Sequence, residues 1–166
     1  AGVWRWPRVL SWAGAAMSDD PRTVLNIGVD PGKSGAIAVV VNEAVLTCKL
    51  DQTLHDMLAF ISQLSANKTK RCVIEKVNAM PRQGVSSTFK FGQSFGQVEA
   101  AIASAGIAYK LVTPAKWQQL MRCRTKGDKN VSKAAAQRLY PHVKMTHAIA
   151  DALLLATLCK ERWEEL

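Results

Sequence analysis

The sequence lacks several features that would place it in a class at once. Its four cysteines, Cys48, Cys72, Cys123 and Cys159, form no CxxC pair, which argues against a zinc knuckle or a disulfide scaffold and favours a reducing compartment. No apolar run reaches the roughly 20 residues of a membrane span, so no membrane partner is expected. Because repeats, low-complexity tracts and linkers are also missing, the 166 residues predict one folded domain.

Acidic residues are scarce as well. The chain has 13 Asp and Glu against 22 Lys and Arg, which gives a net charge of +9. The basic residues concentrate in residues 67–90, where Glu75 is the one acid, and in residues 110–144, where Asp128 is the one acid. Such clustering is typical of a protein that binds a polyanion. The alternative interpretation is a basic surface without a binding role.

Residues 1–22 are expected to form an extension outside the folded domain, which should span residues 23–166. The first 17 residues contain two Arg, three Trp and no acid. They are consistent with the remnant of an organelle transit sequence, with a cloning remnant, or with readthrough upstream of a natural start at Met17.

The pattern of apolar residues predicts a mixed α/β fold. Alternating and β-branched runs predict five strands, at residues 23–30, 36–41, 44–50, 72–77 and 107–112. Helical spacing predicts helices at residues 54–64, 88–105, 114–121, 132–140 and 147–163. Thr113 with Pro114 should start the third helix, and Thr146 should cap the last. Elements in this order predict a five-stranded mixed sheet flanked by helices.

Two carboxylates stand where predicted strands end. Asp30 closes the first strand ahead of a Pro-Gly turn, and Glu75 interrupts the fourth strand near its end. An ionised carboxylate at the end of a buried strand is costly unless a cation pairs with it. If the two strands are neighbours, both side chains project into one crevice at the strand ends, where α/β sheets place ligands. Each acid also has a structural interpretation, Asp30 as a turn residue and Glu75 as the surface partner of a basic neighbour.

Two further candidates begin the last predicted helix. His147 and Asp151 are four residues apart in the segment THAIADALLLA, so they lie on one face of the helix. With Asp30 and Glu75 they make three carboxylates and a histidine on a basic protein. Phosphodiester hydrolysis uses such residues to hold two divalent ions, with Mg²⁺ suited to the carboxylates and Mn²⁺ tolerated by the histidine. The alternative interpretation is a capped helix with an incidental histidine.

The residues Gly32, Lys33 and Ser34 suggest the end of a phosphate-binding loop. That motif needs a glycine five residues before Gly32, where Ile27 stands, and a helix after it, where a strand is predicted. We therefore expect no nucleotide cofactor.

Four segments together resemble the RuvC-type Holliday junction resolvases: IGVDPGKSGAIAVV, CVIEKVNAMPRQGVSSTFKFGQSFG, LVTPAKWQ and HAIADALLLA, in this order over about residues 23–160. The segment NAMPRQGVSSTFKFG and the four-residue spacing of His147 and Asp151 resemble the phage and plastid branch, which includes the plant monokaryotic chloroplast resolvases. In the bacterial enzymes the last two site residues are three apart. The N-terminal extension departs from the phage and bacterial relatives, which usually begin close to the first strand.

This resemblance implies an RNase H-like fold and a Mg²⁺-dependent crossover junction endodeoxyribonuclease with two ions per site. Asp30, Glu75, His147 and Asp151 match the metal-binding and catalytic residues, and Lys129 stands where these resolvases keep a functional lysine ahead of the final helix. The implied active form is a homodimer that nicks two opposing strands of a four-way DNA junction, as two-fold symmetry favours. A plastid nucleoid is the implied compartment, and the cytoplasm of a bacterium or phage-infected cell is the alternative.

The loop after Glu75 and the basic stretches are expected to hold the DNA. Polar side chains of the loop can contact bases or phosphates near the scissile bond, two Phe residues can stack on an unpaired base, and lysines can hold phosphates. Alternatively, one of the two Phe residues packs on the sheet or at the dimer interface. The residues expected to contact DNA are Lys33, Lys76, Arg82, Gln83, Ser86, Ser87, Phe89, Lys90, Phe91, Lys126 and Lys133.

Two other functions stay open. One is a different RNase H-like nuclease that acts on RNA–DNA hybrids or transposon ends. A hybrid cutter would have to read a 2′-hydroxyl, not a branch point, through the loop after Glu75. The other is a non-catalytic DNA-binding module that uses the basic surface alone, which the complete set of four site residues argues against.

Overall fold

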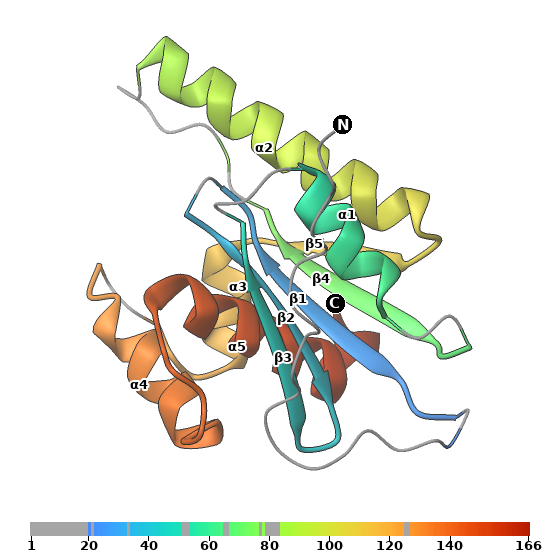
Figure 1. The fold of residues 1–166 in the computed structure, drawn as a ribbon. Helices are drawn as coiled ribbons and strands as arrows, with labels where there is room; N and C mark the ends of the chain where they lie inside the picture. Colours follow the sequence, from blue (N-terminus) through green and yellow to red (C-terminus); the bar gives the residue numbers. More distant parts are fainter. Residues whose placement is uncertain are drawn as a thin grey trace.

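The fold was obtained as a computed structural model, which describes residue 20 and residues 22–32, 34–50, 54–64, 67–76, 78, 84–124 and 127–166. The strands in these residues are β1 (Leu25–Asp30), β2 (Ala36–Val41), β3 (Ala44–Lys49), β4 (Lys70–Glu75) and β5 (Ala108–Val112). The helices are α1 (Leu54–Ser62), α2 (Val85–Ser104), α3 (Pro114–Leu120), α4 (Asn130–Leu139) and α5 (His147–Arg162), with a 3-10 turn η1 (Trp163–Glu165). Figure 1 shows three layers, with α1 and α2 on one face of the sheet and the other helices on the opposite face.

The strands form one sheet in the order β3-β2-β1-β4-β5. β1 pairs antiparallel with β2, and β2 with β3, whereas β1, β4 and β5 run parallel. A two-residue turn at Asn42 and Glu43 joins β2 to β3, and Asn42 has the positive φ, 53°, that such turns favour. The prediction of a five-stranded mixed sheet flanked by helices is therefore confirmed.

Two predicted boundaries near Glu75 were wrong. β4 covers Lys70–Glu75 and not residues 72–77, so Glu75 ends the strand and does not interrupt it. The strand starts early because Lys70 and Arg71 pair with Leu25 and Asn26 of β1. The Arg71 guanidinium also lies over the Trp163 ring, 5.5 Å from the centroid. α2 begins at Val85, not at residue 88, because Gly84 serves as its N-cap in an extended conformation.

The helices on the other face mostly begin where expected. Thr146 caps α5 as predicted, because its hydroxyl accepts the Ile149 N–H at 3.2 Å. Thr113 is the N-cap of α3, although its side chain accepts no cap hydrogen bond. α4 begins two residues before the predicted position, because the Asp128 carboxylate accepts the Asn130 N–H at 2.9 Å. No helix in the described ranges is long and apolar enough to cross a membrane.

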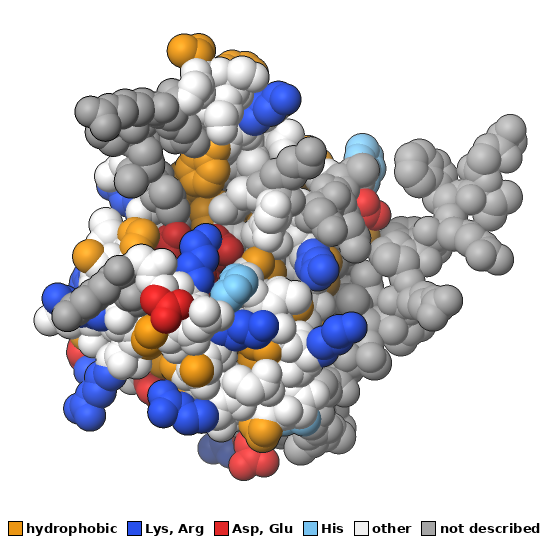
Figure 2. Space-filling view, turned by 90° about the vertical axis from the view of Figure 1, so that its left-hand side faces the viewer, with side chains coloured by type: hydrophobic (Ala, Val, Ile, Leu, Met, Phe, Trp, Pro, Cys, Tyr) orange, Lys and Arg blue, Asp and Glu red, His pale blue; other side chains and the backbone are white. Residues whose placement is uncertain are grey.

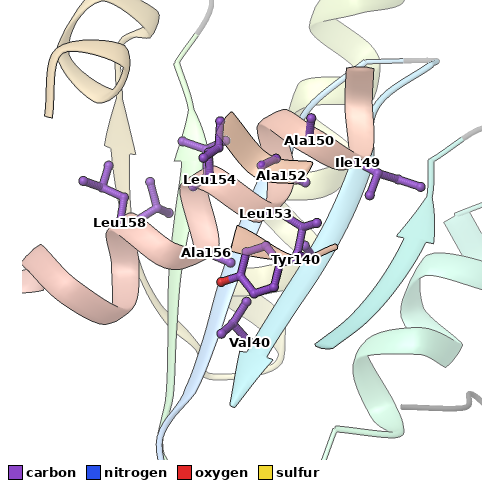
Figure 3. Close-up of a cluster of buried hydrophobic side chains, with 14 of the residues drawn as sticks. Val40, Tyr140, Ile149, Ala150, Ala152, Leu153, Leu154, Ala156 and Leu158 are labelled. Carbon is purple, nitrogen blue, oxygen red and sulfur yellow. The ribbon is translucent and has the colours of Figure 1, made fainter. Parts of the chain in front are cut away.

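Alternation along the strands divides the core into two clusters. Residues 25, 27 and 29 of β1 and residues 72 and 74 of β4 pack with α1 and α2. The residues between them point to the opposite face, where β2 and β4 pack against α5. Figure 3 shows this second cluster, in which Leu153 and Ala156 of α5 lie near Val40 and Tyr140. The Tyr140 and Thr157 hydroxyls share a hydrogen bond of 2.7 Å, so the buried phenol has a polar partner.

Gly28 allows the backbone of α5 to touch the backbone of β1. A Cβ atom at position 28 would collide with the carbonyl oxygen of Ala152 and the nitrogen of Ala156. Residues 28 and 30 point to the same face of β1, so α5 also lies on the face to which Asp30 points. The close approach therefore brings the start of α5 toward the carboxyl end of the strand.

Candidate active site

Asp30 and Glu75 end two neighbouring parallel strands on the same face of the sheet. β1 and β4 are paired with Val29 opposite Ile74, so the next residue along each strand is one of the two acids. Gly28 and Val73, two residues earlier, both face α5, and the two acids share this direction. The two acids therefore lie side by side at the strand ends, and α5 packs on the same face; this corner of the fold is called the crevice below.

The start of α5 contributes Asp151 and His147. Asp151 is half-buried beside Ala152, the residue that touches Gly28, whereas His147 is exposed at the first position of the helix. Burial raises the pKa of Asp151 and the charge of His147 partly opposes this rise, so the two side chains are close enough to interact, as their four-residue spacing predicted. The structure thus brings together all four predicted site residues, with His147 at the rim.

Burial and mutual repulsion raise the pKa of Asp30 from 3.8 to about 8. Burial is the largest cause because it disfavours the charged carboxylate, and the charges of Glu75 and Asp151 add to it. Lys129 acts in the opposite direction and lowers the pKa. An isolated strand-end turn residue would not carry such a shift, so the structural interpretation of Asp30 alone is not sufficient.

The other two acids have raised pKa values for the same reasons. For Glu75 the largest cause is burial; the charge of Asp151 also raises the pKa, whereas a hydrogen bond from Trp117 lowers it. For Asp151 burial again raises the pKa, and a hydrogen bond from the Ser132 hydroxyl lowers it. Lys129 lowers the pKa of both carboxyls. Every pair of the three acids therefore interacts electrostatically, and the positive charge of Lys129 acts on all three.

Lys129 comes from the turn before α4, where it is the N-cap residue and is exposed. Its charge lowers the pKa of all three acids, so it lies within electrostatic range of them, and its role as the functional lysine stays a prediction. Figure 2 shows this face of the molecule, where acidic side chains lie in a recess beneath Lys and Arg side chains, with a histidine beside them. A basic rim around an acidic recess suits a phosphate backbone above a cation.

The donor set fits a divalent cation. Three carboxylates supply oxygen ligands of the kind that Mg²⁺ prefers, and their repulsion would be relieved by a positive charge. Oδ1 of Asp151 is buried and has no hydrogen-bond partner among the described residues, so it is free to bind an ion. The described side chains nevertheless form no group of three or more His, Cys, Asp or Glu that could hold a metal directly. The four residues interact through their charges, and their assignment as metal ligands stays a prediction.

The two Phe residues after Glu75 differ in surroundings. Phe91 lies against the turn after β1, where a Cβ atom on Gly32 would be 3.7 Å from its ring, and it is 6.4 Å from the Phe95 ring centroid. Phe89 is 73% exposed on the first turns of α2. The alternative in which one Phe packs on the protein thus applies to Phe91, and Phe89 is the one available for stacking.

The other predicted DNA contacts divide by position. Lys76, Ser86, Ser87 and Lys90 are exposed, and Lys133 on α4 is half-exposed. Ser86 and Ser87 belong to the first turn of α2 and not to the preceding loop, so helix geometry sets their direction. Contact of these residues with DNA stays a prediction. Lys33, Arg82, Gln83, Lys126 and the N-terminal extension up to residue 19 lie outside the described residues.

Sequence reasoning missed three residues that shape the site. Trp117 donates its indole N–H to Oε2 of Glu75 at 2.6 Å, Ser132 hydrogen-bonds Asp151, and Gly28 sets the approach of α5. A signal existed for Trp117, because a buried indole N–H needs an acceptor and the motif LVTPAKWQ places it after β5. Lys49 was also missed; with Ser34 and His147 it lines a cavity of about 290 Å³ beside the site.

The fold is similar to that of solved RuvC structures. A structure of RuvC from Thermus thermophilus matches with a TM-score of 0.53 and 17% identity, over 81% of this chain and 90% of that one. A second structure, T. thermophilus RuvC in complex with Holliday junction substrate, has a TM-score of 0.49 and 16% identity, with the same coverage. No family model matches this chain, and no curated protein matches it. The predicted RNase H-like fold is confirmed by the first likeness, which at this identity shows the fold alone.

Proposed function

We propose that this protein is a metal-dependent endonuclease that resolves four-way DNA junctions by paired symmetric nicks. The observation that carries the proposal is the crevice in which Asp30, Glu75 and Asp151 raise one another's pKa while Oδ1 of Asp151 has no partner among the described residues. Three neighbouring carboxylates destabilise the fold by mutual repulsion unless a cation binds between them, and with a bound metal ion they form a catalytic site. The net charge of +9 suits a polyanionic substrate. The RNase H-like fold and the resemblance of the sequence motifs to junction resolvases support the choice of substrate.

The four site residues and Lys129 divide the chemistry among them. Asp30, Glu75 and Asp151 would bind Mg²⁺, or Mn²⁺ in its place, with His147 as a fourth ligand or as the group that positions water. When bound, two such ions would supply an activated water and stabilise the leaving oxygen. His147, exposed at the rim, is placed to take a proton from a water above the crevice. Lys129 offsets negative charge next to the three acids.

The surface around the crevice suits branched DNA. Exposed Lys76 directly follows β4, exposed Lys90 lies on α2, and Lys133 is on α4. Phe89 projects from the first turns of α2, where it can stack on a base that is unpaired at the branch point. An exposed aromatic ring on α2 favours a substrate with unpaired bases over a fully paired duplex.

Paired nicks need two sites related by two-fold symmetry, and a homodimer with one site per protomer provides them. The four-residue spacing of His147 and Asp151 supports our proposal that the protein is related to the phage and plastid resolvases, and a plastid nucleoid is the compartment we propose. The dimer can be tested with a supercoiled plasmid that extrudes a cruciform. Paired cutting should convert it directly to the linear form, and accumulation of the nicked circle would contradict the dimer.

The cleavage test compares three labelled substrates of related sequence: a four-way junction, a linear duplex and an RNA–DNA hybrid. Each is incubated with the full chain in Mg²⁺, in Mn²⁺ and in chelator. We expect cleavage of the junction in either ion and none in chelator. Equal cutting of the duplex, or cutting in chelator, would refute the proposal. Preference for the hybrid would favour a different RNase H-like nuclease, and binding without cutting would favour a DNA-binding module.

A further inference from the structure

Trp117 is completely buried, with 0% of its surface exposed, yet it has a polar group to satisfy. Its indole nitrogen donates to Oε2 of Glu75 at 2.6 Å, which is short for an N–H···O hydrogen bond. Hydrogen bonds to a charged acceptor are shorter and stronger than those between neutral groups. The indole therefore contacts one of the three acids through a single directed bond, and reaches no solvent.

The backbone holds this indole in a fixed relation to Glu75. β5 pairs with β4 so that Val112 lies opposite Glu75, and the Val112 carbonyl accepts the Lys76 N–H at 2.8 Å. α3 follows at once, with Pro114 at its first turn, and the Trp117 N–H bonds the Thr113 carbonyl at 3.1 Å. The path from the strand that pairs with Glu75 to the indole is short and hydrogen-bonded throughout.

We propose that Trp117 is a positioning residue for the metal site: its indole N–H holds Oε2 of Glu75, so that Oε1 is the oxygen left to bind a divalent cation. This inference rests on the proposed function. Donors that hold the non-coordinating atom of a ligand fix its orientation, and their loss weakens metal binding although they never touch the ion. A carboxylate with both oxygens free would rotate in the crevice and would turn toward or away from Asp151.

A purely structural Trp117 would give a different pattern. Tryptophan is a large core residue, and its shortening destabilises a fold regardless of the polar atom. The two roles separate when the N–H is removed while the ring is kept. Trp117→Phe loses the donor and part of the volume, whereas replacement of Trp117 by benzothienylalanine changes the N–H to sulfur and keeps the shape.

The test measures Mn²⁺ binding by titration calorimetry on the full chain, for the unchanged protein, for both position-117 variants and for Trp163→Phe. Trp163 is the matched control, because its ring contacts Arg71 and Lys110 away from the acids. We expect both position-117 variants to bind Mn²⁺ about 10- to 100-fold more weakly, and Trp163→Phe to bind it within about twofold of the unchanged protein. Junction binding in chelator should be equal in all four, because Trp117 is buried.

A spectroscopic measurement tests the bond between Trp117 and Glu75 directly and does not depend on a change in Mn²⁺ affinity. The chain has five tryptophans, so the indole N–H region of a ¹⁵N-labelled sample holds five resonances to assign. The Trp117 resonance should shift on addition of Mg²⁺ and on Glu75→Ala. Unchanged Mn²⁺ binding by the benzothienylalanine protein, or a Trp117 resonance that ignores Mg²⁺, would overturn this inference alone. Absence of Mn²⁺ binding by the unchanged protein would overturn the proposed function with it.

Discussion

In the absence of divalent ions, we expect Asp30→Asn to make the protein more stable at alkaline pH. The pKa of Asp30 rises from 3.8 to about 8 in the fold, so the folded state holds this proton more tightly than the unfolded state. Between these two pH values the unfolded chain binds fewer protons, and the free energy of unfolding falls as the pH rises. Asparagine carries no charge in the folded or the unfolded state, so the variant does not lose free energy of unfolding in this way as the pH rises.

The size of the effect follows from the shift. A rise from 3.8 to about 8 corresponds to about 6 kcal/mol at about 1.4 kcal/mol per pKa unit. The full amount is lost only when the pH passes the folded pKa, and below the unfolded pKa the loss is zero. Domains of this size have a free energy of unfolding of roughly 5–15 kcal/mol, so the charge of one residue is a large fraction of the total.

The assay is urea unfolding in chelator at several pH values between about 4 and about 8, the window set by the two pKa values of Asp30. The advantage of Asp30→Asn over the unchanged protein should grow steadily with pH. Glu164→Gln is the control, because it removes the same charge from an exposed position, and its difference from the unchanged protein should stay flat. Mg²⁺ should then stabilise the unchanged protein more than Asp30→Asn. A pH-independent difference, or a variant that is less stable at about pH 8, would refute the reasoning.

Three further predictions concern the site and its support. Asp151→Asn should abolish junction cleavage while gel-shift affinity persists, because a carboxylate is lost and the phosphate contacts remain; parallel loss of binding would contradict its role as a metal ligand. Phe89→Ala should weaken junction binding by about 1–3 kcal/mol with little change for duplex, whereas Phe91→Ala should mainly lower the melting temperature; equal effects on both DNAs would remove the stacking role. Gly28→Ala should destabilise the fold by about 1–3 kcal/mol and lower the rate of cleavage, because α5 must move off β1; unchanged cleavage would show that this contact does not set the site.

The sheet could be predicted because its determinants are local. Alternation and β-branched runs define β1, β2 and β3, and the turn at Asn42 fixes the register of β2 with β3. The start of β4 could not be predicted from Lys70 and Arg71, because two consecutive basic residues are typical of an exposed loop. Their place in the strand depends on pairing with β1, and Trp163, from the far end of the chain, lies against the Arg71 guanidinium. Long basic side chains can cover apolar surface in this way while their charges stay hydrated.

The start of α2 was misplaced for a similar reason. The helix was expected to begin at Thr88, with Ser86 and Ser87 in the loop before it. The backbone instead turns at Gly84, whose carbonyl accepts the Thr88 N–H at 3.0 Å, and the serines enter the first helical turn. Glycine is favoured at an N-cap although it has no side-chain oxygen to accept the next N–H groups, and local propensity alone does not distinguish the two arrangements.

The acids of the site could be predicted, whereas the groups that hold them could not. Asp30 and Glu75 are visible because charged residues rarely end buried strands, and His147 and Asp151 because of their spacing. The bond from Trp117 to Glu75 joins residues 42 positions apart and exists only once β5 has paired with β4. Such partners follow from the tertiary structure, so they are found by asking which buried donor still lacks an acceptor.

The packing of α5 on β1 connects the stability of the protein to its affinity for a cation. Gly28 lets the helix backbone touch the strand, and this contact brings Asp151 into range of Asp30. Burial then raises the pKa of both acids, which lowers the stability of the ion-free fold near neutral pH. A divalent ion relieves the same repulsion, so the free energy lost in bringing the acids together is recovered when the ion binds. A bulkier residue at position 28 would separate the acids. It would therefore reduce both the free energy lost through their repulsion and the affinity for the cation.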